Sequence, residues 1–372
     1  MRREQVQTSQ LVSTFIVFQM GGLTIYFFGG SAKQDAWLAV LLAACIGLLL
    51  LTLHFAMYRR EPTKNLFELF QHYMGKGLGS VIAMLFCMYF AYESSRSLRD
   101  IGEITVYMLL NQTPIVVPIL MILAIGYMVA RYGPRVYLLG TQVMLPVLLI
   151  SYIILLIMIF GTGLVDFEYM LPVLENGIQP VWDAAVPQML SFPFAQSILF
   201  MVYFPMVKKG GSLRKSMLIS YGAVSLAMLI INQINLLVLG PVLAPTVVFP
   251  LLKVVQLIEL AEVFERMDVL FILAAFLGLG TRMSTFLIAA IIGFSGTTRT
   301  SYSKWVLPVC VAVFIMSLLP SNFTEFYHAG IIVGDMVYPV FQILLPILLF
   351  IVMLLRRNTR SSTSEGRERL YP

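Results

Sequence analysis

The stretch LLGTQVMLPVLLISYIILLIMIF, residues 138–160, decides the fold class, because it is long and contains no charged side chain. An α-helix rises about 1.5 Å per residue, so a stretch of this length can cross a hydrocarbon core of roughly 30 Å. A membrane barrel strand would need only about 10 residues and would alternate apolar with polar side chains. The stretch therefore predicts a transmembrane helix.

Nine other segments are also apolar and of roughly span length, and the whole sequence is 59% hydrophobic with only 12% charged residues. Over 372 residues, this composition leaves too little polar surface to cover a soluble globular protein. We therefore expect an all-α polytopic membrane protein with ten transmembrane helices in a single domain, residues 1–355. The ten segments are residues 8–28, 36–57, 80–110, 114–130, 138–160, 187–207, 217–239, 268–294, 305–319 and 335–355.

Basic residues are concentrated at both ends of the chain and in alternate gaps between the segments, which together hold 19 of the 25 Lys and Arg. Cytoplasmic loops carry such an excess, so we expect both termini to be cytoplasmic. The gap at residues 161–186 has four carboxylates and no Lys or Arg, which suits the outer face. The formal charge of +6 then reflects orientation in the lipid bilayer, and no nucleic-acid partner is predicted.

The last residues differ in composition from the rest of the chain. Residues 356–372 include five arginines and show no apolar periodicity. We therefore expect a disordered basic cytoplasmic tail that is attracted to anionic lipid headgroups.

The sequence shows no motif for catalysis or metal binding. Cys45, Cys87 and Cys310 each fall within a predicted span, and the three His residues are isolated, so we predict neither a disulfide framework nor a metal site. There is no P-loop, no G-x-S-x-G and no H-E-x-x-H. We expect a protein that is not an enzyme and that needs no cofactor.

Two predicted spans are interrupted by residues that disfavour a helix. Residues 18–24, Phe-Gln-Met-Gly-Gly-Leu-Thr, place a glycine pair within the first span, and glycine costs about 1 kcal/mol in a helix interior relative to alanine. Residues 190–196, Leu-Ser-Phe-Pro-Phe-Ala-Gln, place a proline within the sixth span, where it removes a helical hydrogen bond. Either feature alone is also typical of a packing notch or a mild kink.

Together, the two interruptions favour a more specific interpretation. Breaks at corresponding places in two halves are typical of a transporter built as an inverted repeat, with its binding site near the membrane midplane. We therefore expect two repeats of five spans, residues 1–165 and 187–355, with discontinuous helices 1 and 6. Backbone groups freed at residues 20–22 and 191–194 would line a cavity.

Charged residues within the third span are further candidates. Arg96 and Asp100 are four apart, as are Arg99 and Glu103, so each pair can neutralise internally on one helix face. Two interpretations remain open: structural ion pairs that brace helix packing, or a lining of the ligand route or its gate, to which Glu93 would belong.

Two regions near the eighth span also carry charge. Glu265 ends a short predicted helix, residues 250–265, whose acidic stripe is typical of a solvated face, and Arg266 follows it at the membrane edge. Arg266 is one of few basic residues on the expected outer side, so this pair is kept as a structural or gating charge. Arg282 is expected in the inner half of the span, where its guanidinium can reach water by snorkelling.

Five stretches, in order along the chain, carry a resemblance to a known family. They are Gln34-Asp35-Ala36-Trp37; Asn65-Leu66-Phe67-Glu68 with Gly75-Lys76-Gly77-Leu78-Gly79; Arg99 and Glu103 followed by Thr113-Pro114-Ile115; Leu171-Pro172-Val173-Leu174-Glu175-Asn176-Gly177; and Phe264-Glu265-Arg266. Because of these five stretches, residues 8–357 resemble the B-subunit family of bacterial spore germinant receptors. Its members are also called spore germination permeases, a branch of the amino acid/polyamine/organocation transporter superfamily.

The resemblance implies a LeuT-like fold of ten spans, a small germinant bound between broken spans 1 and 6, and a complex with A-type and C-type receptor subunits. Two positions depart from the family pattern. Family members often carry Pro-Phe-Gly-Glu where this chain has Pro193-Phe194-Ala195-Gln196, and a break resembling G-x-G where it has Met20-Gly21-Gly22. An amide in place of the carboxylate favours a neutral or zwitterionic germinant, with a small amino acid as the expected class.

The predicted site would bind both ends of such a ligand. Free N–H groups near Gly21 and Gly22 would bind its carboxylate, helped by the positive end of a half-helix, and carbonyls near Ser191 and Phe192 would accept from its ammonium group. The predicted ligand-binding residues are Met20, Gly21, Gly22, Thr24, Tyr92, Ser191, Phe192, Phe194 and Gln196, and the structural or gating charges are Glu93, Arg96, Arg99, Glu103, Glu265 and Arg266.

The expected function is a sensor in the spore inner membrane that binds a small nutrient germinant and signals to partner subunits. The alternative is an amino acid or polyamine secondary transporter driven by an ion gradient, with Glu93, Asp100 and Glu103 as candidate coupling carboxylates. An ion channel opened by germinant within a larger oligomer is compatible with the sensor. The same cavity would serve all three, so the fold does not separate them.

Overall fold

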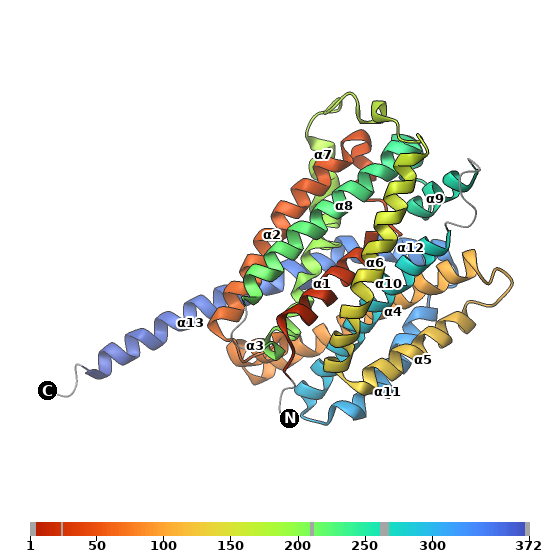
Figure 1. Ribbon diagram of the computed structural model, residues 1–372. Helices are drawn as coiled ribbons and strands as arrows, with labels where there is room; N and C mark the ends of the chain where they lie inside the picture. Colours follow the sequence, from red (N-terminus) through yellow and green to blue (C-terminus); the bar gives the residue numbers. More distant parts are fainter. Residues whose placement is uncertain (1–4, 24, 209–211, 261–267, 369–372) are drawn as a thin grey trace.

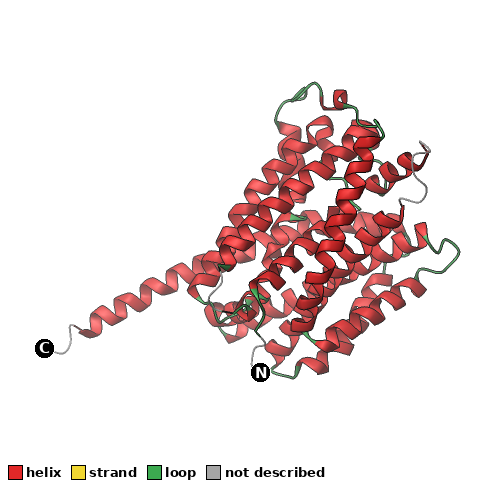
Figure 2. Ribbon diagram, viewed as in Figure 1, coloured by secondary structure: helices red, strands yellow, loops and turns green. Residues whose placement is uncertain are grey.

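The computed structural model describes residues 5–23, 25–208, 212–260 and 268–368 of the chain. These residues form a bundle of helices without a β-strand, and an isolated bridge joins Val6 to Val207 (Figure 2). The predicted all-α fold is confirmed. Thr24, Glu265 and Arg266, which the sequence analysis placed at the site, lie outside the described residues.

Among the described residues, six helical stretches are long and apolar enough to cross a membrane, and two shorter apolar helices accompany them. The six contain α2 (Ala36–Arg60), α4 (Lys76–Met108), α6 (Pro134–Gly161), α8 (Leu213–Leu243), α10 (Asp268–Thr298) and the pair α12 (Phe323–Met336) and α13 (Leu345–Glu368). The shorter helices are α5 (Val116–Tyr132) and α11 (Tyr302–Leu318). With α1 (Thr8–Leu23) and the broken helix described below, helical structure overlaps all ten predicted segments, so the polytopic membrane fold is confirmed.

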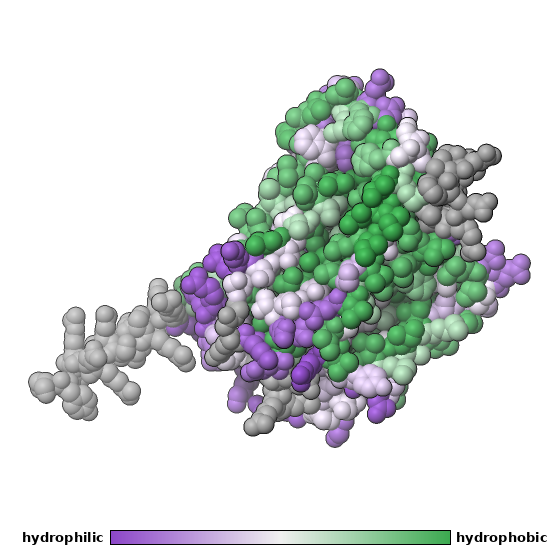
Figure 3. Space-filling view, viewed as in Figure 1, coloured by the Kyte–Doolittle hydropathy of each residue, from purple (hydrophilic) through white to green (hydrophobic). Residues whose placement is uncertain are grey.

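The outer surface of the bundle fits a bilayer. Large apolar side chains are exposed along α5 and α6, among them Ile125, at 64%, and Ile157, at 66%. Figure 3 shows apolar residues across the middle of one face and hydrophilic residues gathered toward its ends. Exposure of such an apolar surface to water would be unfavourable, whereas the hydrocarbon chains of lipids can cover it. The chain is an integral membrane protein; which of its ends face the cytoplasm stays a prediction.

The centre of the bundle is built on α10, which packs against α1, α4 and α6 (Figure 1). In its most apolar stretch 72% of the residues are buried, the largest share among the six long stretches. α1 crosses α10 where Gly21 meets Gly278. Because neither residue has a side chain, the two backbones come into direct contact.

The first span is interrupted later than predicted. α1 remains helical through Leu23, and residues 25–29 are non-helical before the 3-10 helix η1 (Gly30–Asp35) leads into α2. The prediction of an unwound segment at residues 20–22 is therefore wrong. The glycine pair stays helical because its packing against α10 compensates for its weak helix propensity.

The sixth span is interrupted where proline predicts it. The chain passes through α7 (Gln179–Ala184) and the π-helical turn η3 (Ala185–Met189), leaves the helix at Phe192 and Pro193, and resumes in the 3-10 helices η4 (Phe194–Val202) and η5 (Phe204–Met206). Helices 1 and 6 are thus both discontinuous, the first at a later position than predicted. The division into two repeats, residues 1–165 and 187–355, stays a prediction.

Three further helices lie outside the predicted spans or extend them. α3 (Leu66–Met74) precedes α4, and α9 (Pro250–Leu260) follows α8. α12 begins at Phe323, well before the predicted start of the tenth span at residue 335, and the π-helical turn η6 (Val340–Leu344) joins it to α13.

The end of α13 falls within the tail for which the sequence predicts disorder, and that disorder stays a prediction. The structure is helical as far as Glu368, and this end projects from the bundle (Figure 1). No proline interrupts residues 356–368, so the hydrogen-bonding pattern begun at Leu345 can propagate along the polar segment.

Candidate functional site

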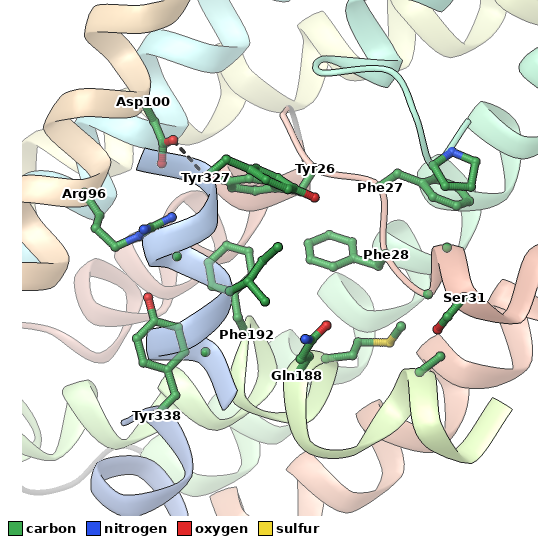
Figure 4. A pocket seen from close by; sticks show the side chains of 18 of the residues that line it. Tyr26, Phe27, Phe28, Ser31, Arg96, Asp100, Gln188, Phe192, Tyr327 and Tyr338 are labelled. Carbon is green, nitrogen blue, oxygen red and sulfur yellow. Dashed lines mark hydrogen bonds between the residues drawn. The ribbon is translucent and has the colours of Figure 1, made fainter. Parts of the chain in front are cut away.

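A cavity of about 370 Å³ lies between the interrupted first and sixth spans (Figure 4). Its wall comes from the non-helical segment after α1, from α4, from the residues before the proline break, from α10 and from α12. Small-molecule sites typically measure roughly 300–1,000 Å³, so the cavity can hold a metabolite of modest size. The lining includes Tyr26, Phe28, Ser31, Glu93, Arg96, Asp100, Gln188, Phe192, Arg282, Tyr327, Gly334 and Tyr338.

Aromatic rings form the apolar part of the wall. The ring of Phe192 meets Tyr26 edge-on, with centroids 5.4 Å apart, and lies 5.8 Å from the ring of Phe28. Tyr327 and Tyr338 contribute further rings from α12 and the turn after it (Figure 4). Such rings can cover an apolar side chain or an apolar face of a ligand.

α4 supplies a charged face. Glu93, Arg96 and Asp100 recur at spacings of three and four, which places them on one side of the helix, and all three line the cavity. Figure 4 shows Arg96 and Asp100 on the side of the cavity opposite Ser31. The Tyr26 hydroxyl donates a hydrogen bond of 2.8 Å to Asp100 Oδ1. The sequence left open whether these three residues brace the helix packing or line the ligand site, and this geometry favours the second interpretation.

Arg96 and Asp100 interact electrostatically, but their side chains do not form a direct ion pair in the described part of the chain. Arg96 instead places its guanidinium 4.5 Å from the centroid of the Phe326 ring and donates to the Phe326 carbonyl oxygen at 3.4 Å. It therefore links α4 to α12, a helix that the sequence analysis did not assign.

Arg99 and Glu103 form the other predicted pair, and this one is present. Arg99 Nε lies 2.7 Å from Glu103 Oε1, and Arg99 Nη1 donates to the carbonyl oxygens of Ser317 and Pro320, each at 3.1 Å. Neither charged residue lines the cavity. The pair therefore ties α4 to the end of α11, which is the bracing interpretation.

Arg282 is the main residue that the sequence analysis misjudged. Its side chain is only 3% exposed and lines the cavity, so the expectation that it snorkels to water is wrong. The guanidinium lies 4.7 Å from the ring centroid of Phe18 and 4.8 Å from that of Phe192. The close approach of α1 at Gly278, one turn earlier on α10, brings Arg282 beside the end of α1, and the sequence alone does not show this contact.

A buried hydrogen-bonded chain joins three spans beside the cavity. Arg282 Nη2 donates to Gln196 Oε1 at 2.8 Å, and Gln196 Nε2 donates to Glu93 Oε2 at 3.0 Å. Both bonds lie in the bundle interior, where an unpaired polar group is costly. Gln196 itself does not line the cavity but holds two residues that do.

The remaining predicted ligand residues lie at different distances from the cavity. Phe192 lines it, and a Cβ atom at Gly22 would lie 3.3 Å from the Phe192 ring. The other predicted residues that the structure describes are not part of the lining. Of these, Met20 accepts a hydrogen bond from Tyr152, Gly21 contacts Gly278, Phe194 packs against Tyr221, Ser191 is buried, and Tyr92 is partly buried on α4.

The direction of α1 does not support the predicted carboxylate site. α1 ends at Leu23, so its C-terminal end meets the interruption. The last carbonyl groups of a helix lack intrahelical donors and carry the negative end of its dipole. The N–H groups of Gly21 and Gly22 remain within the helix and do not face a ligand as predicted. The C-terminal end of α1 instead favours a positive group such as the guanidinium of Arg282.

A metal centre was not predicted, and the described side chains offer no obvious one. In the part of the chain searched, no group of three or more His, Cys, Asp or Glu side chains is placed to hold a metal ion.

Comparison with known proteins adds the family context. A family model described as "Spore germination protein" matches residues 5–326. Spore germination protein KB of Bacillus subtilis (strain 168) is 30% identical over 371 residues, covering 99% of each chain. Spore germination protein A2 of the same organism is 26% identical over 332 residues, covering 87% of each chain.

Solved structures show a similar fold at low sequence identity. A crystal structure of a point mutant of the Eremococcus coleocola manganese transporter aligns with a TM-score of 0.52 at 15% identity. The alignment covers 93% of this chain and 76% of the transporter. A second point mutant of the same transporter gives a TM-score of 0.51 at 14% identity, with the same coverage of each chain. This likeness concerns the fold, which is LeuT-like as predicted.

Proposed function

The chain belongs to this family of spore germination proteins, and from that premise we propose that it is the membrane subunit of a spore germinant receptor. It binds a small nutrient germinant in the cavity between the interrupted spans and signals to A-type and C-type partner subunits. It acts in the spore inner membrane with both termini in the cytoplasm. The observation that carries the proposal is the cavity itself, because it lies at both helix interruptions and combines aromatic with charged groups.

The position of the cavity suits a sensor. Its wall is shared by α4, α10, α12 and the two non-helical segments, so a bound ligand contacts elements from both halves of the bundle. A ligand shifts a conformational equilibrium only if it binds one state more tightly, and coupling of about 1–3 kcal/mol is typical. A ligand that contacts several elements can provide such a difference, if those elements are arranged differently in the two states.

The charges in the wall support a ligand without net charge. Two carboxylates, Glu93 and Asp100, are matched by two guanidinium groups, Arg96 and Arg282. A ligand with a net charge would disturb this balance in a low-dielectric environment. This balance fits the zwitterionic small amino acid that the sequence analysis expects as the germinant class.

The test is germination of spores that lack this chain and are complemented with cavity variants. Gly334 lines the cavity, and a Cβ atom there would meet nothing within 4 Å in the described part of the chain, so Gly334→Leu adds bulk to the cavity without a backbone clash. We expect Gly334→Leu to reduce the nutrient response at least about tenfold at an unchanged protein level. The matched control is Gly140→Leu on α6, which is also helical, has equally open space and lies outside the lining. An equal response from both variants would argue against the cavity.

A secondary transporter is the second candidate, because the fold resembles that of a manganese transporter. Uptake of a radiolabelled germinant into proteoliposomes, abolished by an ionophore, would favour transport. Ion conductance that appears only with germinant and partner subunits would favour the channel form of the receptor. Binding without either would favour the sensor alone.

A further inference from the structure

Residues 26–31 line the cavity without interruption, and the chain is non-helical as far as residue 29 (Figure 4). A segment without helical hydrogen bonds keeps one shape only if other groups bind its main chain. The chain also turns sharply here, since Gly29 has a φ of 75°. Whatever binds the main chain of this segment therefore shapes a large part of the cavity wall.

Asn232 on α8 binds both polar main-chain groups of Phe28. The Phe28 N–H donates to Asn232 Oδ1 at 2.8 Å, and Asn232 Nδ2 donates to the Phe28 carbonyl oxygen at 3.0 Å. An amide can accept from an N–H and donate to a carbonyl at once, and one orientation of Asn232 satisfies both bonds. Among the described residues, no main-chain group forms either bond in its place.

Asn232 acts from outside the cavity. It is not part of the lining, whereas Phe28 is, with its ring centroid 5.8 Å from that of Phe192. Asn232 is 1% exposed, and residues 226–231 directly before it are all apolar. A polar group at such a place is costly unless it is hydrogen-bonded. The two bonds to Phe28 satisfy the amide and at the same time tie α8 to the cavity wall.

We propose that Asn232 is a positioning residue, which holds residues 25–29 in the conformation that completes the cavity and touches no ligand. The inference rests on the proposed germinant-binding role of the cavity. If only a fraction of the molecules has an ordered wall, the apparent dissociation constant equals the intrinsic one divided by that fraction. Asn232 therefore raises the apparent affinity for every ligand of the cavity by the same factor and does not choose between ligands.

The first test measures local order by hydrogen–deuterium exchange of the full chain in lipid nanodiscs. Asn232→Leu keeps nearly the same shape and removes both bonds. We expect residues 25–35 to exchange about tenfold faster in this variant, because the segment opens more often without the two hydrogen bonds. Residues 116–132, in α5, should exchange as in the unmodified chain.

The matched control for the exchange measurement is Tyr221→Phe. Tyr221 is also buried on α8, and its hydroxyl donates to the carbonyl oxygen of Ala44 at 2.7 Å, but neither residue lines the cavity. This control should leave the exchange of residues 25–35 unchanged. Equal exchange of residues 25–35 in the two variants would overturn the proposal.

The second test separates positioning from ligand contact. Spores that lack this chain are complemented with the unmodified chain, Asn232→Leu or Tyr221→Phe, and germination is recorded against the concentration of each standard L-amino acid and of glucose. For Asn232→Leu we expect half-maximal concentrations about tenfold higher for every active nutrient, with the same maximum response. Tyr221→Phe should respond as the unmodified chain.

Two germination results would contradict the proposal. A shift confined to some of the nutrients would mean that Asn232 contacts the ligand. No shift at an equal protein level would mean that the cavity wall does not depend on Asn232.

The unmodified protein decides if Asn232→Leu does not fold. Its residues 25–35 should exchange more slowly than the exposed residues 171–178, and equal rates would overturn the proposal. The proposed function fails separately, if Gly334→Leu and Gly140→Leu give the same germination response. The exchange measurements need no ligand, so they distinguish the two failures.

Discussion

A Cβ atom at Gly21 would lie 2.5 Å from the backbone carbonyl carbon of Gly278, so α1 and α10 cross with their backbones in contact. The obstructing atom belongs to the main chain and cannot rotate away. This contact places the end of α1 beside Arg282 and thus sets one wall of the cavity.

Gly21→Ala should therefore destabilise the protein, although alanine favours a helix by about 1 kcal/mol over glycine. Overpacking of this kind typically costs about 1–3 kcal/mol, which exceeds the gain in helix propensity. The melting temperature of the purified protein in detergent is the measurement. Gly280→Ala on α10 is the control, because no described atom lies within 4 Å of its Cβ position, and its melting temperature should be unchanged or slightly higher.

Arg99→Met should destabilise the protein more than Glu103→Gln. Removing the guanidinium leaves Glu103 without its partner and also removes the donor to the carbonyls of Ser317 and Pro320. Breaking a buried pair costs about 3–5 kcal/mol, whereas Glu103→Gln leaves Arg99 its two carbonyl bonds. Chemical denaturation of the purified variants measures the difference. Arg131→Met is the control, since Arg131 is exposed and, among the described residues, hydrogen-bonds to Tyr127 on its own helix. Equal losses from Arg99→Met and Glu103→Gln would show that the carbonyl bonds contribute little.

Much of the fold could be predicted from sequence because its determinants are local. A span is recognised by apolar length alone, and Pro193 interrupts its helix through its own missing N–H. The charged face of α4 also follows from spacing, since Glu93, Arg96 and Asp100 stand three and four residues apart. These features depend on one segment at a time.

The misjudged features depend on contacts between segments. The sequence of the glycine pair near Gly21 predicts a break in the helix, yet packing against α10 keeps this segment helical. Arg282 was predicted to snorkel to water because the sequence does not show that α1 ends beside it. α12 could have been found from Tyr327, Gly330 and Gly334, which recur on one helix face, but its role in closing the cavity is a tertiary property.

The orientation predicted from charge asymmetry can be tested by labelling. In a variant without Cys45, Cys87 and Cys310, single cysteines are introduced as Ser361→Cys and Asn176→Cys. A membrane-impermeant maleimide applied from outside should label position 176 but not 361, because cytoplasmic segments carry the excess of Lys and Arg. Permeabilisation should expose position 361. Labelling of both from the same side would contradict the orientation.

Tyr26→Phe should weaken the nutrient response while leaving the protein in the membrane. The substitution keeps the ring that packs edge-on against Phe192 and removes only the hydroxyl that donates to Asp100. Asp100 is 9% exposed, and a hydrogen bond to a charged group contributes roughly 1.5–3 kcal/mol, so its carboxylate would become a free acceptor in the cavity wall. We expect the germination dose-response to shift to about tenfold higher germinant concentration, with the protein level checked by immunoblot. Tyr107→Phe, on the same helix as Asp100 but 62% exposed, is the control and should respond as the unmodified chain. A response of Tyr26→Phe equal to that of the control would mean that the bond between Tyr26 and Asp100 does not shape the binding site.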